Sequence, residues 1–151
     1  MMYTIDANVF IAASRPSETH NAISRHFLET LNRMNLVIFC PTLVIPEAVS
    51  AVARVTDDSV VRNSIVQLIK KKKNLYFVTV TNGLAQRAAA IAQLQRLRGA
   101  DSVYVAVAEM YATTLITWDA EMLQRSPAIV TASTPQMWLD QQSNNGRKNG
   151  P

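Results

Sequence analysis

Short runs of apolar residues alternate along this chain with longer stretches in which apolar positions recur at helical spacing. The short runs predict strands at residues 2–5, 36–40, 76–80, 114–118 and 129–130. The longer stretches predict helices at residues 17–35, 46–54, 57–70, 84–97, 102–111, 121–124 and 135–140. Nearly continuous apolar strands separated by helices are typical of a parallel sheet covered on both faces, so the pattern predicts the α/β class. In such sheets, ligands bind outside the carboxyl ends of the strands.

Length and composition predict the domain organisation. The chain has 151 residues, of which 48% are hydrophobic and 17% charged, a balance typical of one globular domain. We place that domain at residues 1–140 and expect the polar segment 141–151, rich in Gly and Asn, to be a disordered tail.

Charge and cysteine usage narrow the cellular setting. A net charge of +4 permits a polyanionic partner without requiring one. Cys40 is the only cysteine, so no internal disulfide can form, which favours a reducing cytoplasmic location. The N-terminus lacks the basic region of a signal peptide and reaches a charge at Asp6. The longest apolar runs, such as 36–40, are far shorter than the about 20 residues that span a bilayer, so we expect no membrane association.

Four of the eleven acidic residues stand where such a sheet is expected to carry chemistry. Asp6 and Asp119 directly follow predicted strands and therefore belong to the carboxyl edge. Glu47 and Asp101 open predicted helices beside apolar residues. Taken singly, Glu47 and Asp101 also have a local explanation, because a carboxylate at a helix N-terminus caps the helix and complements its dipole, and Asp6 fits an Asx-turn.

As a group, these four carboxylates indicate a metal. Partly buried carboxylates at one edge repel one another and raise each other's pKa values unless a cation balances them. The ligands would be oxygen atoms, which suits Mg²⁺ or Mn²⁺ better than zinc. His20 and His26 lie on nearly opposite faces of one predicted helix, so they are not joint ligands. Sites built from carboxylates and such ions commonly serve phosphoryl chemistry.

The four segments that contain these acids resemble the motifs of the PIN-domain family, in the same order along the chain. The segments are residues 3–11, 45–54, 98–108 and 115–119. The likeness extends over nearly the whole predicted domain, and the size of the chain is similar to that of VapC-like toxins, the small ribonucleases of type II toxin–antitoxin pairs. The resemblance implies a three-layer α/β/α fold with a central, mostly parallel sheet flanked by helices.

The resemblance also implies an activity and a set of site residues. The activity is metal-dependent endonucleolytic cleavage of RNA, at a Mg²⁺ or Mn²⁺ site. The residues that match the family's acids are Asp6, Glu47, Asp101 and Asp119. Asn8 and Thr117 would orient these carboxylates or a bound water. Glu121 could replace Asp119 or add a further carboxylate. The implied partners are an RNA substrate, a small antitoxin protein that shields the acids, and a second copy of the chain in a homodimer.

Basic and aromatic residues are candidates for contacts with RNA. The densest charge run consists of Lys70, Lys71, Lys72 and Lys73. These lysines could bind phosphates, or they could be the solvated end of a helix. Arg98 is a further candidate for phosphate binding because it stands close to Asp101. Trp118 could stack on a base or pack against a helix.

Three functions are compatible with these patterns. We favour a Mg²⁺- or Mn²⁺-dependent endoribonuclease, because all four acidic positions are present. The alternative is a catalytically silent PIN-like module that binds RNA or protein. A phosphatase-like enzyme with Asp6 as nucleophile is disfavoured, since that chemistry usually needs a second carboxylate two residues on, where this chain has Asn8.

Overall fold

A single five-stranded sheet forms the centre of the protein, and every strand pairs in parallel with its neighbours. The computed structural model describes residues 1–148. The strand order is β3-β2-β1-β4-β5. The strands are β1 (Met2–Ile5), β2 (Val37–Pro41), β3 (Leu75–Val78), β4 (Thr114–Ile116) and β5 (Ala132–Ser133). The α/β prediction is confirmed, and the sheet is parallel throughout.

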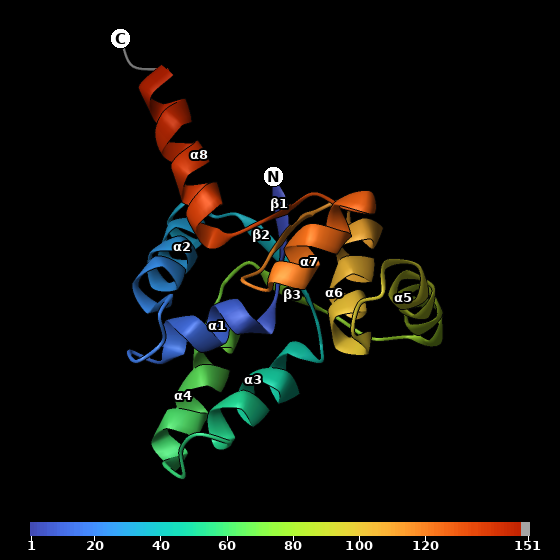
Figure 1. Ribbon diagram of the computed structural model, residues 1–151. Helices are drawn as coiled ribbons and strands as arrows, with labels where there is room; N and C mark the ends of the chain where they lie inside the picture. The colour runs from blue at the N-terminus through green and yellow to red at the C-terminus, as the bar shows by residue number, and fades with distance from the viewer. Residues whose placement is uncertain (149–151) are drawn as a thin grey trace.

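Helices cover both faces of this sheet (Figure 1). The helices of residues 1–148 are α1 (Ala7–Ser14), α2 (Asn21–Arg33), α3 (Val44–Ala53), α4 (Ser59–Lys70), α5 (Asn82–Gln95), α6 (Gly99–Met110), α7 (Ala120–Arg125), the short 3₁₀ turn η1 (Ser126–Ala128) and α8 (Pro135–Lys148). Helices α1–α4 pack against one another on one side, α5 and α6 pack together on the other, and α8 contacts α2. This is the three-layer arrangement that the resemblance implied. Within the same residues, no helix combines the length and the apolar character of a membrane span.

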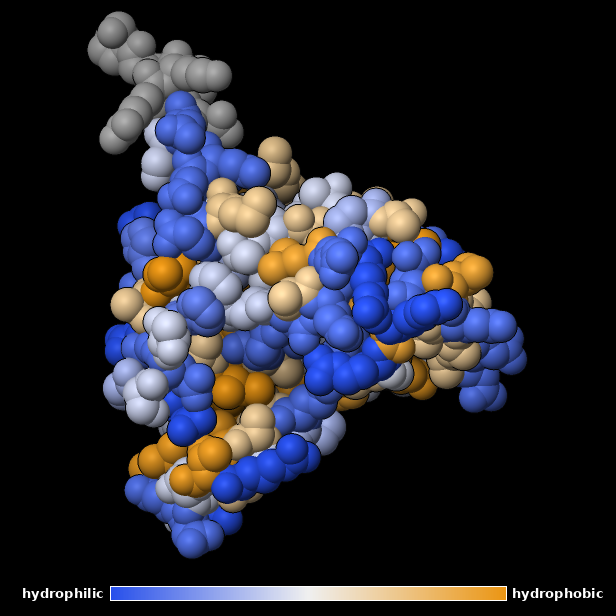
Figure 2. Space-filling view, in the orientation of Figure 1, coloured by the Kyte–Doolittle hydropathy of each residue, from blue (hydrophilic) through white to orange (hydrophobic). Residues whose placement is uncertain are grey.

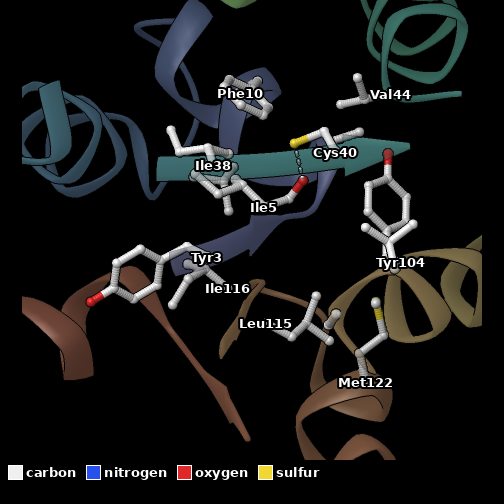
Figure 3. Packing of buried hydrophobic residues seen from close by; sticks show 14 of the residues in the cluster. Tyr3, Ile5, Phe10, Ile38, Cys40, Val44, Tyr104, Leu115, Ile116 and Met122 are labelled. Carbon is white, nitrogen blue, oxygen red and sulfur yellow. Dashed lines mark hydrogen bonds between the residues drawn. The ribbon is translucent and has the colours of Figure 1, made fainter. Parts of the chain in front are cut away.

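Strand β1 lies in the middle of the sheet, and the hydrophobic core surrounds it. Ile5, Leu115 and Ile116 have no exposed surface. Figure 3 shows Phe10 of α1 above strand β2 and Met122 of α7 below it, so both helical layers contribute to the packing. Each fully buried side chain of this kind stabilises the fold by about 1.5–3 kcal/mol. The core therefore fixes the strand ends at which the predicted acids lie.

Helix α1 is an element that the sequence pattern did not predict. Its eight residues, ANVFIAAS, are nearly all apolar, and five of them are buried, so no polar face marks a helical period. Asp6 caps this helix, because its backbone is extended and its carboxylate accepts the backbone N–H of Asn8. The turn that the sequence suggested after β1 is therefore the N-terminus of a helix.

Two further boundaries differ from the predicted ones because of backbone conformation. Arg96, with φ 54°, adopts the left-handed conformation that ends α5, so Gly99 begins α6 instead of ending the preceding helix. Ala112, with φ 50°, follows α6 in the same conformation. The last strand comprises residues 132–133 and not 129–130, because the chain first makes the turn η1 before it pairs with β4.

Helix α8 extends beyond the predicted end of the domain. Its start is anchored by Trp138, which is 3% exposed and meets the rings of Tyr3 and Phe27 edge-on at centroid distances of 5.7 and 5.2 Å. The helix continues from this anchor, so residues 141–148 are helical where their composition predicted a disordered tail. A polar composition indicates exposure to solvent, which an exposed helix satisfies as well as a coil does. The last part of the predicted tail, residues 149–151, lies outside the described residues.

Candidate functional site

A cleft of about 560 Å³ opens where the connections of the sheet diverge. Strands β1 and β4 are neighbours, but the chain leads from β1 to β2 on one side and from β4 to β5 on the other. Such switch points are where open α/β sheets bind ligands. Figure 2 shows this face hollowed between α3 and the region of α6 and α7, where hydrophilic residues gather. The charged residues that line the cleft are Asp6, Glu47, Arg54, Arg98, Asp101 and Asp119.

All four predicted acids thus meet in one cleft, and each lies at the start of a helix. Asp6 and Asp119 follow β1 and β4 and accept backbone N–H groups of α1 and α7 at 3.3 and 2.9 Å. Glu47 and Asp101 lie in the first turns of α3 and α6. Asp6 and Asp119 are the capping residues of α1 and α7, whereas Glu47 and Asp101, for which the sequence suggested capping, lie in the first turns without capping α3 and α6. Capping also fixes the orientation of the Asp6 and Asp119 carboxylates at the edge of the cleft.

The hydroxyl of Thr117 connects three parts of the site. It donates to Asp6 Oδ2 at 2.7 Å, and it accepts from the Asn8 side-chain amide at 3.0 Å and from the Asp119 backbone N–H at 2.9 Å. The Asn8 amide oxygen in turn accepts the backbone N–H of Trp118 at 3.2 Å. Thr117 has no exposed surface, so its hydrogen bonds are shielded from water. Asn8 and Thr117, which were expected to orient the acids, are thus hydrogen-bonded to each other, and each donates a hydrogen bond to Asp6.

Asp6 occupies an environment that disfavours its negative charge. Only 7% of its surface is exposed, and this burial raises the pKa of its carboxyl to about 7. Hydrogen bonds from Thr117 and Asn8 oppose the rise because they favour the ionised form, whereas the negative charges of Asp101 and Glu47 add to it. A positive charge in the cleft would favour the ionised form of Asp6.

Glu47 is held by a residue that the sequence analysis missed. Tyr104 of α6 is 1% exposed and donates its hydroxyl to Glu47 Oε2 at 2.6 Å. Burial raises the pKa of Glu47, and this hydrogen bond opposes the rise. The signal that could have found Tyr104 is its position three residues after Asp101, which places both residues on one face of α6.

Arg98 bridges two of the acids across the cleft. Its Nε donates to Asp101 Oδ2 and its Nη2 donates to Asp119 Oδ2, each at 2.7 Å. Burial raises the pKa of Asp101, and the hydrogen bond and charge of Arg98 lower it. The Arg98 side chain is 68% exposed, so this bridge is in contact with solvent.

One wall of the cleft is a face of α3. Glu47, Ser50, Ala51 and Arg54 all line the cleft, at the i, i+3, i+4 and i+7 positions of one helical face. Arg54 is exposed and adds a positive charge that the sequence analysis did not consider. The signal that could have identified Arg54 is its position seven residues after Glu47, which places both residues on one helical face.

The predicted lysine run lies elsewhere. Lys70 ends α4, and Lys71, Lys72 and Lys73 lead from it toward β3. This places the run at the amino edge of the sheet, whereas the acids lie at the carboxyl edge. Lys72 Nζ donates to the Leu28 carbonyl at 3.4 Å, and burial lowers the pKa of this lysine. The RNA contact expected of this run stays a prediction.

Two neighbours of Asp119 also have contacts of their own. Glu121 is exposed, pairs with Arg125 at 3.5 Å and does not line the cleft, whereas Asp119 does. The Trp118 ring stacks on His20 at a centroid distance of 3.8 Å and donates its Nε1–H to Ser24 Oγ at 2.9 Å. Trp118 therefore packs against the start of α2.

The donor set of the cleft fits a hard divalent cation in charge and in chemistry. Carboxylates from four separate segments line it, and oxygen ligands suit Mg²⁺ or Mn²⁺. Among residues 1–148, however, no three histidine, cysteine or acidic side chains are already close enough together to hold an ion. In this arrangement, the Arg98 guanidinium donates a hydrogen bond to one oxygen of Asp101 and to one oxygen of Asp119.

Comparison with known protein families bears on this cleft. The family described as PIN domain matches residues 3–126, a span that includes all four acids. The chain belongs to the PIN-domain family. This result confirms the resemblance seen in the four sequence motifs. Among curated proteins, no sequence matches this chain.

Solved structures with the same PIN fold include toxins. VapBC2 from Rickettsia felis, solved with a promoter DNA fragment, is 14% identical, with 89% of this chain and 98% of that chain covered and a TM-score of 0.69. VapC20 from Mycobacterium tuberculosis, a Sarcin-Ricin loop cleaving toxin, is 11% identical, with coverages of 78% and 90% and a TM-score of 0.67. A toxin–antitoxin complex from Klebsiella pneumoniae is 15% identical, with coverages of 88% and 97% and a TM-score of 0.63. At these identities the likeness establishes the fold.

Proposed function

We propose that this PIN-domain protein is a metal-dependent endoribonuclease that hydrolyses phosphodiester bonds in RNA, acting in the cytoplasm as the toxin of a toxin–antitoxin pair. The observation that carries this proposal is the convergence of four carboxylates in one cleft at the β1–β4 switch point. Membership of the PIN-domain family supports nuclease activity. The RNA-cleaving toxin among the structural neighbours supports RNA as the substrate.

In the proposed mechanism, the four cleft carboxylates hold Mg²⁺ or Mn²⁺, which when bound supplies activation of water and neutralisation of charge at the phosphate. The residues assigned to this role are Asp6, Glu47, Asp101 and Asp119. Thr117 and Asn8 orient Asp6 through their hydrogen bonds, and Tyr104 orients Glu47. Ionised Asp6 depends most on the cation, because burial disfavours its charge.

Arg54 is proposed to bind the substrate. It is an exposed cation on the α3 wall of the cleft, and a guanidinium matches a phosphate group in charge and in hydrogen-bonding geometry. For the lysine run at the amino edge we propose a minor contribution at most, because it lies at the opposite edge of the sheet from the acids.

A small antitoxin protein is the proposed partner. The toxin–antitoxin complex among the structural neighbours supports this assignment. The homodimer that the resemblance implied is also a proposal. The mass of the purified protein in solution, measured with and without a co-expressed antitoxin, tests both.

Cleavage of a labelled RNA tests the nuclease proposal directly. We expect the wild-type protein to cut in Mg²⁺ or Mn²⁺ and to be inactive in EDTA. Asp101→Asn should reduce the rate by about 100-fold or more, because altering even a residue behind a metal ligand costs 10–100-fold. Asp57→Asn alters an exposed acid just before α4 and is the matched control, with an unchanged rate expected.

The same assay separates the alternatives. Cutting that persists in EDTA, or in Asp101→Asn, contradicts the proposed site. Wild-type protein that binds RNA without cutting it in either metal would support the alternative, a catalytically silent PIN-like module that binds RNA or protein.

A further inference from the structure

The guanidinium of Arg98 is bonded to two of the four cleft acids at once. Asp101 Oδ2 and Asp119 Oδ2 each accept one of its N–H groups at 2.7 Å. The other oxygen of Asp119, Oδ1, accepts the backbone N–H of Met122 at 2.9 Å and so caps α7. Both oxygens of Asp119 are therefore engaged, one by a helix and the other by an arginine.

The backbone sets up this contact. Arg98 is the extended residue that precedes α6, and Asp101 follows three positions later in the first turn of that helix. Asp119 belongs to the segment between β4 and α7. The bridge thus connects the start of α6 to the carboxyl end of β4, the two places that supply half of the acids in the cleft.

A divalent cation would compete with this guanidinium for the same carboxylates. Two negative charges held close together are stabilised by a positive charge between them, and either a guanidinium or a metal ion supplies it. The two cations repel each other, and an oxygen that accepts a short N–H bond is less available as a metal ligand. A cation that binds Asp119 therefore competes with Arg98 for Oδ2.

We propose that Arg98 is an internal counter-ion, which holds Asp101 and Asp119 in the metal-free protein and leaves both when a divalent cation binds. The inference rests on the proposed function, because it assumes that the cleft binds a divalent cation. Because the Arg98 side chain is 68% exposed, its ion pairs are screened by solvent and weak enough for an ion to displace. Arg98 thereby lowers the metal affinity, and once released it is a free cation beside the acids, where an RNA phosphate would bind.

Titration with Mn²⁺, followed by the electron paramagnetic resonance signal of the free ion, tests this exchange without any RNA. Arg98→Gln should bind Mn²⁺ about 3- to 10-fold more tightly than wild type, the change expected when weak exposed ion pairs no longer compete. Arg87→Gln is the matched control. Arg87 also makes two hydrogen bonds to a carboxylate, at 2.6 Å to Glu109, and is exposed, but it lies on α5 and does not line the cleft. Its Mn²⁺ affinity should equal that of wild type.

The outcomes separate this inference from the proposed function. If Arg98→Gln binds Mn²⁺ no more tightly than wild type, while Asp101→Asn binds it more weakly, the cation site stands and the role of Arg98 is overturned. If wild type does not bind Mn²⁺, or Asp101→Asn binds it equally well, the cation site fails and the inference fails with it.

Nuclear magnetic resonance of the arginine Nε–H groups gives a second readout. In metal-free protein, the Arg98 Nε–H signal, assigned by its loss in Arg98→Gln, should be protected from exchange with water by the bond to Asp101. Saturating Mg²⁺ should remove this protection and leave the Arg87 signal unchanged. Protection of Arg98 that survives Mg²⁺ saturation overturns the inference.

Discussion

Replacing Asp6 by Asn tests whether the metal-free cleft disfavours a buried negative charge. Asn has the same shape as Asp and can still accept the Thr117 hydroxyl, but it has no charge. The pKa of Asp6 rises from 3.8 in the unfolded chain to about 7 in the folded protein, so between these values the folded state binds the proton more tightly. The stability contributed by this proton is fully present below pH 3.8 and is lost as the pH rises through about 7.

The magnitude follows from the same pKa values. Each pH unit over which only the folded state holds the proton changes the free energy of unfolding by about 1.4 kcal/mol. Between pH 5 and pH 8, Asp6 should therefore lower the stability of the wild-type protein by about 3 kcal/mol. Asp6→Asn does not titrate, so its stability relative to wild type should increase by this amount over the same range.

Urea unfolding followed by circular dichroism at pH 5, 6, 7 and 8, in EDTA, measures the difference. Asp57→Asn, which alters an exposed acid, should run parallel to wild type at every pH. Saturating Mn²⁺ should reduce the advantage of Asp6→Asn at pH 8, because a cation in the cleft stabilises the ionised carboxylate of the wild type. An Asp6→Asn curve that runs parallel to wild type in EDTA would refute the reasoning about burial and charge.

Two further predictions concern residues that support the site, and a third concerns the backbone just after α6. Thr117→Val leaves buried hydrogen-bonding groups without their partner and should lower the free energy of unfolding, measured in urea, by about 2–3 kcal/mol. Thr117→Ser keeps the hydroxyl and should be close to wild type. An equal loss of stability in both variants would indicate that Thr117 acts through packing and not through its hydrogen bonds. Tyr104→Phe removes the hydrogen bond to Glu47 and should weaken Mn²⁺ binding in the titration described above, and an unchanged affinity would contradict the positioning role. Ala112→Gly relieves a left-handed backbone at φ 50° and should raise Tm by about 1–3 °C in a thermal melt, whereas a lower Tm would show that the backbone is unstrained.

Strands β1 and β4, and with them two of the acids, could be predicted from the sequence for a physical reason. A strand buried on both faces in a parallel sheet is an almost unbroken apolar run, and the chain must leave it at the carboxyl edge. Asp6 and Asp119 follow such runs, so their shared location needs no knowledge of tertiary contacts. Glu47 and Asp101 were recognisable as first-turn residues of helices beside apolar neighbours.

The features that were missed depend on contacts or conformations that local patterns do not encode. Helix α1 is mostly apolar because five of its eight residues are buried, which hides its period. The hydrogen bond of Tyr104 to Glu47 joins residues 57 positions apart. Arg96 ends a helix in a conformation for which glycine is the usual signal, and β5 is only two residues long. The bridging role of Arg98 could not be distinguished from phosphate binding, since the same side chain serves either.

The central position of β1 has a consequence for synthesis of the protein. Asp6 is synthesised before Thr117, whose hydroxyl donates a hydrogen bond to it and which comes 111 positions later. Until then β1 lacks one of its two neighbouring strands, and pairings between such distant segments form slowly. The cleft can therefore be complete only after Asp119 has been synthesised, and a chain that stops before Asp119 lacks one of its four acids.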